Sequence, residues 1–306
     1  MTYEAKRDIY QAITDKIIAD LERGVRPWHR PWTSGNATSS RPLRANGILY
    51  QGINVVLLWI EASLKGYASP TWMTFKQAQA VGACVRKGEK GSMVVYANAI
   101  TRTETDASTG EDSELRIPFL KSYTVFNVAQ IDGLRPMPPA PETADRLTDV
   151  DRIMAADAFF ATVGADLRHG GARAFYAPAV DAITLPPFAA FESPGSYYAT
   201  LAHEHIHWTG HSRRLNRLEK APKASEPYAR EELVAELGSA FLCADLGISD
   251  EPREDHASYL ASWLKVLRED KRAIVTAASA AQRAVNFLHE SLGTLPEAEA
   301  DEAAAA

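Results

Sequence analysis

The feature that most constrains the fold is a short motif in the second half of the chain, where His203 and His207 flank Glu204 with the spacing HExxH. On an α-helix, residues four positions apart lie on the same face, so both imidazoles point to one side and Glu204 points toward the same pocket. Two imidazoles placed in this way can grip a zinc ion. The segment is therefore predicted to be a helix whose motif-bearing face meets another element that supplies further ligands.

A third ligand has to come from elsewhere, because a catalytic zinc ion takes three protein ligands and leaves one position for water. The longer pattern HExxHxxGxxH is followed up to Gly210, but position 213 is Arg instead of His. The next predicted helix offers Glu232 and Glu236, which share a face one turn apart. We assign Glu232 as the third ligand and Glu236 as the acceptor for the second ring nitrogen of His203, and the reverse assignment is the alternative.

The predicted ion is Zn²⁺, with another divalent cation such as Mn²⁺ as the alternative. Glu204 is then the general base for a water molecule that attacks a carbonyl, which is the reaction of a metallopeptidase. Tyr197 and Tyr198 precede His203 by one to two turns and are candidates for oxyanion support. Two plainer interpretations stand beside this one: the histidines are ordinary residues of a partly buried helix, or the metal is structural or vestigial.

The charge of the chain changes sign at a proline-rich segment. Residues 1–135 contain 17 basic and 13 acidic residues, a net charge of +4, whereas the rest contains 16 basic and 26 acidic residues, a net charge of −10. A moderately basic module suits a polyanionic partner. We predict a single-stranded-DNA-binding domain over 1–135, a stiff linker over 136–147, a metallopeptidase-type domain over 148–295 and a disordered tail over 296–306.

The predicted fold class is α+β in two domains, with a mostly helical second domain that contains a small sheet. Hydrophobic periodicity and turn residues define the elements. In the first half they are helices over 9–21, 54–64 and 74–82, and a β-hairpin of strands 92–97 and 119–128 with a loop over 101–113. In the second half they are helices over 148–163, after Ser193, over 231–246 and within 256–289, and short strands over 173–176 and 181–185.

The first half also contains the side chains that hold single-stranded nucleic acid, which are cations that follow the phosphates and aromatic rings on which bases stack. Duplex-reading motifs such as zinc fingers and basic zippers are absent from the sequence. In the alternative interpretation the tryptophans are core residues and the glycine-lysine turn is a solvated hairpin. The candidate contacts to single-stranded DNA are Trp28, Arg30, Trp32, Arg41, Arg44, Tyr50, Arg86, Lys87 and Lys90.

Neither export nor membrane insertion is indicated by the sequence. The first ten residues are charged and polar, and the longest nearly apolar run, 53–60, is too short to span a bilayer. The two cysteines, Cys84 and Cys243, lie in different halves without a paired spacing, so no disulfide framework is predicted. We therefore expect a cytoplasmic protein without a membrane partner.

A set of short segments in both halves carries a family resemblance. The segments are Pro27-Trp28, Pro31-Trp32, 50–54 (YQGIN), 72–78 (WMTFKQA), 85–91 (VRKGEKG), 125–130 (VFNVAQ), 198–211 (YATLAHEHIHWTGH) and 231–237 (EELVAEL). With them, most of the chain resembles ArdC-type antirestriction proteins of conjugative plasmids. The resemblance implies a single-stranded-DNA-binding domain, a zincin-like metallopeptidase domain and protection of incoming plasmid DNA from host restriction. A host restriction enzyme or another protein is then the expected peptidase target.

Overall fold

The computed structural model describes residues 8–23, 28, 41–105, 112–134, 149–218, 225–248, 256–291 and 293. Its helices and small sheets form a mixed α+β protein, in which the first half combines both kinds of element and the second half is mostly helical. The predicted fold class is therefore confirmed. The linker over 136–147 and the tail over 296–306 lie outside the described residues, so both stay predictions.

The first half packs short helices against a small sheet. The sheet has the strand order β1-β2-β5-β4, in which only β1 and β2 run parallel, and a separate ladder joins β3 to β6. The elements are α1 (Ile9–Glu22), β1 (Leu43–Arg44), α2 (Ile53–Lys65), β2 (Thr71–Thr74), α3 (Phe75–Ala80), β3 (Cys84–Val85), β4 (Ser92–Thr105), β5 (Asp112–Asn127), a 3₁₀ turn (Val128–Gln130) and β6 (Ile131–Asp132).

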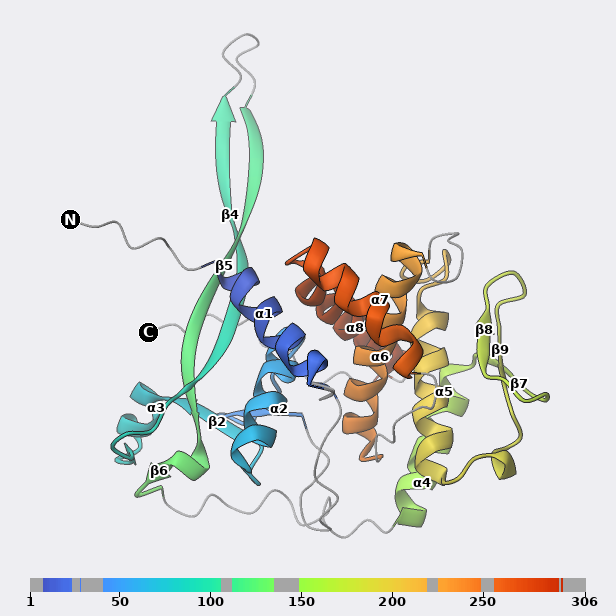
Figure 1. Ribbon diagram of the computed structural model, residues 1–306, viewed down its shortest axis with the longest axis horizontal. Helices are drawn as coiled ribbons and strands as arrows, with labels where there is room; N and C mark the ends of the chain where they lie inside the picture. Colours follow the sequence, from blue (N-terminus) through green and yellow to red (C-terminus); the bar gives the residue numbers. More distant parts are fainter. Residues whose placement is uncertain are drawn as a thin grey trace.

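The hairpin of β4 and β5 is longer than the sequence predicts. Backbone pairing runs from Ser92 opposite Val125 to Thr105 opposite Asp112. The outer part of this ribbon extends away from the other elements (Figure 1). The sequence predicts a loop over 101–105 because its residues are polar, whereas a strand is usually predicted from an apolar face. A two-stranded ribbon that packs against no core does not need an apolar face, so polar residues can form it.

The second half places helices beside a three-stranded sheet of order β7-β9-β8. In Figure 1 this sheet and α5 lie on one side of the helices α6, α7 and α8, and the first half of the chain lies on the other side. The elements are α4 (Asp149–Val163), β7 (Asp166–His169), β8 (Phe175–Ala177), β9 (Ala182–Leu185), a 3₁₀ turn (Phe188–Ala190), α5 (Pro194–Thr209), α6 (Glu226–Leu246), α7 (His256–Glu269) and α8 (Ala273–Glu290).

Helices α5 and α6 cross at very short range, and this crossing positions the motif. The hydroxyl of Ser193 accepts a hydrogen bond from the backbone N–H of Ser196 at 3.0 Å and caps the start of α5. At the crossing, a Cβ atom added to Gly238 of α6 would lie 2.9 Å from side-chain carbons of Ile206 on α5. Glycine is thus required there, because any side chain would push the two helices apart.

The two halves share one apolar core. The buried cluster runs from Ile13 in α1 to Leu288 in α8 without a break between the halves. Trp59 of α2 meets Phe241 of α6 with ring centroids 5.9 Å apart, in an edge-to-face arrangement. The halves are therefore packed together as one body, and the boundary near residue 135 stays a prediction.

No helix in the described part of the chain combines the length and the apolar character that crossing a bilayer requires.

Candidate metal centre

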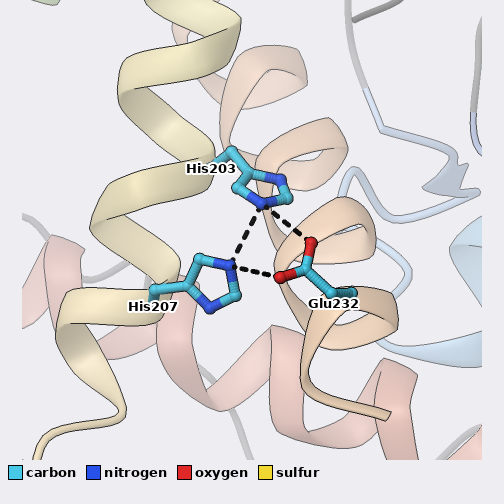
Figure 2. A group of neighbouring side chains, drawn as sticks. All are labelled: His203, His207 and Glu232. Carbon is cyan, nitrogen blue, oxygen red and sulfur yellow. Dashed lines mark hydrogen bonds and ion pairs between the residues drawn. The ribbon is translucent and has the colours of Figure 1, made fainter. Parts of the chain in front are cut away.

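The motif histidines converge with a carboxylate from the neighbouring helix. The Nε2 atoms of His203 and His207, both on α5, lie 3.1 Å apart. They lie 3.6 Å and 3.5 Å, respectively, from the two carboxylate oxygens of Glu232 on α6. Figure 2 shows the three side chains pointing toward one another across the α5–α6 contact. One ligand atom from each residue lies within 4.8 Å of the other two, so the predicted trio forms a single cluster.

The spacing of these atoms fits a divalent metal. Tetrahedral ligands at about 2.1 Å from a zinc ion are themselves about 3.4 Å apart, which matches the separations in this cluster. Two imidazole nitrogens and one carboxylate suit Zn²⁺, and the same donors are compatible with Mn²⁺. His203 and Glu232 are also almost fully buried. The cluster therefore supplies three buried or largely buried donors for one divalent ion.

A further carboxylate lies near the other ring nitrogen of each imidazole. The Nδ1 atom of His203 lies 3.3 Å from a carboxylate oxygen of Glu236, the residue proposed from the sequence as its acceptor. The Nδ1 atom of His207 lies 3.1 Å from Glu231, a residue that the sequence analysis did not single out. Arg217 donates to Glu231 at 2.8 Å and to the carbonyl oxygen of Ile206 at 2.6 Å. Such outer carboxylates fix the ring orientation, so that both Nε2 atoms face the ion position.

The electrostatics of the cluster favour a cation. Burial alone lowers the pKa of His207, but hydrogen bonds and charges from Glu231 and Glu232 reverse this effect and raise that pKa to about 10. For Glu232 the two effects are opposite in sign. Burial raises the pKa of this carboxyl group, but hydrogen bonds and charges from His203 and His207 outweigh burial and hold the pKa well below its usual range. Positive charge between these side chains is thus strongly stabilised, whether a proton or a metal ion provides it.

Glu204 lies beside the cluster in a large cavity. The cavity has a volume of about 1130 Å³ and is lined by His203, Glu204, His207 and Glu232, together with residues of β8 and α8. Glu204 is only 3 % exposed. The general base predicted from the sequence therefore shares its cavity with the three predicted ligands.

The predicted oxyanion residues require a correction. The hydroxyl of Tyr197 lies 2.9 Å from Nε2 of His169, and the hydroxyl of Tyr198 donates to Asp157 at 2.6 Å. Neither tyrosine lines the cavity. On an ideal helix, residues 197 and 198 lie well off the face that carries His203 and His207, which explains the difference. Tyr228, at the start of α6, lines the cavity instead.

Three of the predicted DNA contacts are interior residues. Trp28 is 2 % exposed, Arg41 4 % and Tyr50 7 %. Trp28 packs edge-to-face against Trp263, and Arg41 is ion-paired with Asp245. These side chains cannot contact a strand on the surface in this conformation, so the plainer interpretation holds for them.

The remaining predicted DNA contacts divide into four groups. Lys87 and Lys90 are exposed at the turn before β4. Arg86 is also exposed, but its guanidinium group donates to Glu89 at 2.8 Å and to a backbone carbonyl. Arg44 is partly buried and lies over the ring of Tyr50. Arg30 and Trp32 lie outside the described residues.

Replacement of Arg217 is expected to weaken metal binding without removing a ligand. In Arg217→Met, the carboxylate that orients His207 loses its guanidinium partner, and we expect the metal dissociation constant to rise by about 10- to 100-fold. Competition against a chromophoric chelator measures this change. Arg213→Met is the matched control, because Arg213 is exposed on the same loop. Equal dissociation constants for the two variants would show that Arg217 does not orient the site.

Two family models match separate parts of the chain. Residues 7–126 match the family described as the N-terminal domain of the anti-restriction factor ArdC, and residues 154–280 match the zincin-like metallopeptidase family. The chain thus combines an ArdC-type N-terminal domain with a zincin-like metallopeptidase domain, whose fold implies a divalent metal.

Similar proteins match the chain over nearly its full length. The crystal structure of the antirestriction protein ArdC from plasmid R388 is 45% identical in its metal-free form, with a TM-score of 0.77, and covers 95% of this chain and 100% of that one. Its Mn(II)-bound form is 44% identical, with a TM-score of 0.76, and covers 94% of this chain and 100% of that one. The chain belongs to the ArdC family of antirestriction proteins.

Two further relatives differ in their total length. An uncharacterized protein of Sinorhizobium fredii, y4eC, is 42% identical over 94% of both chains. The DNA primase TraC of Escherichia coli is 40% identical over 93% of this chain, which corresponds to 27% of the primase.

Proposed function

We propose that this antirestriction protein hydrolyses a polypeptide at its metal centre and binds single-stranded DNA on its first half, and so protects incoming plasmid DNA from host restriction. The observation that carries the proposal is the convergence of two Nε2 atoms, the carboxylate of Glu232 and the carboxylate of Glu204 on one open cavity. Zn²⁺ is the proposed ion, and Mn²⁺ is the alternative.

In the proposed reaction, three residues hold the ion and Glu204 transfers the proton. His203, His207 and Glu232 hold the ion, which when bound supplies Lewis acidity that activates water and polarises a carbonyl group. The carboxylate of Glu204 accepts the proton of the attacking water and then delivers it to the nitrogen of the leaving amine. His203, Glu204 and Glu232 are themselves almost fully buried, which strengthens the charge interactions among them.

Strand β8 offers a place for the substrate backbone. Within the described residues it pairs only with β9, and residues of β8 line the cavity. An unpaired strand edge can accept an extended peptide through backbone hydrogen bonds. An extended polypeptide bound along β8 would therefore lie in the same cavity as Glu204.

The alternative is a metal that only stabilises the fold, in a protein that acts by binding DNA. A structural zinc ion usually has four protein ligands and no open position. The described residues provide three converging ligands, and the cavity beside them has a volume of about 1130 Å³. This open volume favours the hydrolytic function.

Metal removal tests the proposal directly. The full-length protein is expected to contain about one metal ion per chain and to cleave a fluorescently labelled denatured protein. Treatment with a chelator should abolish cleavage, and Zn²⁺ or Mn²⁺ should restore it. Elemental analysis and the fluorescence assay measure both quantities. Bound metal without any cleavage would support the structural alternative.

The DNA-binding half of the proposal is best supported by one exposed surface. Lys65 of α2, which also pairs with Glu61, donates to the backbone carbonyl of Lys90 at 3.1 Å, so its ammonium group lies at the turn before β4. Phe75, which is 45 % exposed, packs against Phe126 of β5. Lys87 adds another exposed cation to this turn. Cations beside an exposed aromatic ring form the combination that holds unpaired strands.

Charge reversal at this surface is expected to weaken DNA binding. In the double variant Lys87→Glu and Lys90→Glu, the slope of log affinity against log salt concentration should fall by about 1.4, since each lost phosphate contact on a single strand contributes about 0.7. Fluorescence anisotropy with a labelled oligothymidylate measures the slope. Lys265→Glu, an exposed lysine on α7, is the matched control. An unchanged slope in the double variant would place the strand elsewhere.

A further inference from the structure

Of the residues that the structure describes, four arginines line the cavity beside the metal centre, and two of them are already engaged by carboxylates. Arg217 pairs with the carboxylate that orients His207, at 2.8 Å, and Arg230 pairs with Glu226, also at 2.8 Å. The other two, Arg173 and Arg283, are exposed. Among the described residues, no carboxylate pairs with either of them.

Arg283 occupies a defined position on the cavity wall. It follows Ala273, Ala277 and Ala280 along one face of α8, and all four residues line the cavity. Its Nη1 atom donates to the hydroxyl of Ser279 at 2.9 Å, which uses one of the five donors of the guanidinium group. The alanines of α8 thus form an apolar strip of the cavity wall, and Arg283 lies at the C-terminal end of this strip.

This end of α8 lies close to the metal-binding turn of α5. Phe287, one turn beyond Arg283, packs against Trp208 with ring centroids 6.3 Å apart. Trp208 directly follows the ligand His207. Arg283 and the metal ligands line the same cavity, so a chain bound at the metal centre can place another of its side chains beside Arg283.

We propose that Arg283 makes the cavity select polypeptides that carry an acidic side chain near the reacting bond. The inference rests on the proposed function, because it takes the ligand to be a polypeptide. The planar guanidinium group matches a carboxylate through two parallel hydrogen bonds. The second half of the chain carries 26 acidic and 16 basic residues, so acidic partners for an arginine are in excess there. An arginine of the cavity for which the described residues provide no carboxylate partner is therefore unusual in this half, and its guanidinium group is available to a ligand.

A nucleic acid strand fits this cavity less well than an acidic polypeptide. A strand brings one phosphate for every nucleotide, whereas the lining includes the carboxylates of Glu192, Glu204, Glu231 and Glu232. Much of the remaining lining is apolar, including Phe175 and the alanines of α8. Two isolated cations, Arg173 and Arg283, between largely apolar walls suit single carboxylates rather than a run of phosphates.

Binding to a protein that cannot turn over tests the selection. Full-length, zinc-loaded Glu204→Gln is titrated with labelled degenerate octapeptides in which one central residue is fixed as Glu, Gln or Lys. The Glu pool should bind about tenfold more tightly than the Gln pool. Arg283→Gln in the same background should reduce this ratio to below about twofold. Arg283→Glu should make the Lys pool the tightest binder, a gain that a misfolded protein cannot produce.

Several results would overturn the selection. They are equal affinities for the Glu and Gln pools, an unchanged Glu preference in Arg283→Gln, no binding of any pool, and displacement of the peptides by oligothymidylate in a manner that depends on Arg283. Incubation of the same pools with the protein that retains Glu204 separates the two proposals. Cleavage without an acidic preference overturns the selection alone, and acid-selective binding without cleavage overturns the peptidase function alone.

Discussion

Replacing Glu204 with Gln should lower the rate of peptide hydrolysis by at least a factor of about 10² to 10⁴, the usual contribution of a general base. The amide has nearly the same shape as the carboxylate, but it cannot accept the proton of the attacking water. Because Glu204 is not one of the converging ligands, the metal content should stay at about one ion per chain. Initial rates on a labelled denatured protein and elemental analysis of the same sample measure the two effects.

The matched control is Glu269→Gln, which makes the same chemical change at an exposed position on α7. Its rate and its metal content should both equal those of the unmodified protein. If Glu204→Gln retained full activity, Glu204 would not be the base. If it lost both activity and metal, the loss would reflect a damaged site and would not assign a proton transfer to this residue.

The largest loss of stability is expected from Arg41→Ala. The guanidinium group of Arg41 is 4 % exposed and binds both carboxylate oxygens of Asp245, one of them at 2.6 Å. It also donates to Gln282 of α8 at 2.8 Å. Removing one partner of such a buried pair typically costs about 3–5 kcal/mol, because the other charge stays buried. Urea unfolding of the full-length protein at neutral pH measures this difference.

A second ion pair between the same halves provides the control. Arg268 and Glu22 lie 2.5 Å apart, but both side chains are about half exposed. Such a pair contributes roughly 0–1 kcal/mol. Arg268→Ala should therefore have little effect. Similar losses in the two variants would mean that burial does not set the value of the Arg41 contact.

The Arg41 contact should also depend on pH. Burial by itself raises the pKa of Asp245, but the hydrogen bond with His289 and the charge of Arg41 hold it below its ordinary value of 3.8. A carboxyl group whose pKa is lower in the folded protein than in the unfolded chain stabilises the fold at any pH above the unfolded-state pKa. This stabilisation is lost as the pH falls through the folded-state pKa. The difference between the unmodified protein and Arg41→Ala should shrink below about pH 3.8.

The centre of the site could be read from the sequence because it follows helical geometry. The i, i+4 spacing places His203 and His207 on one face, and a buried helix with acidic residues supplies Glu232. Glu231 and Arg217 were missed for a physical reason. Glu231 is rotated by about 100° from Glu232 on the helix. Arg217 belongs to a loop, where spacing does not determine which way a side chain points.

The interface between the halves could not be read from local patterns. Trp28, Arg41 and Tyr50 lie in or beside polar, loop-like sequence, which favours surface positions, but tertiary packing against α6, α7 and α8 buries them. A charged residue in such a stretch pairs with Asp245, 204 positions further along the chain. Contacts over this distance leave no periodic signal in the sequence.

Helix α8 is shared by the two halves, and this limits how the gene can be rearranged. Gln282 accepts a hydrogen bond from the backbone N–H of Gly52 at 3.1 Å, while the neighbouring Ala280 and Arg283 line the cavity. A hybrid that took its first half from an unrelated donor would leave Asp245 buried opposite a mismatched surface. Recombination should therefore transfer both halves together. The match to the much longer TraC primase agrees with this expectation, because it spans 93% of this chain and so includes both halves.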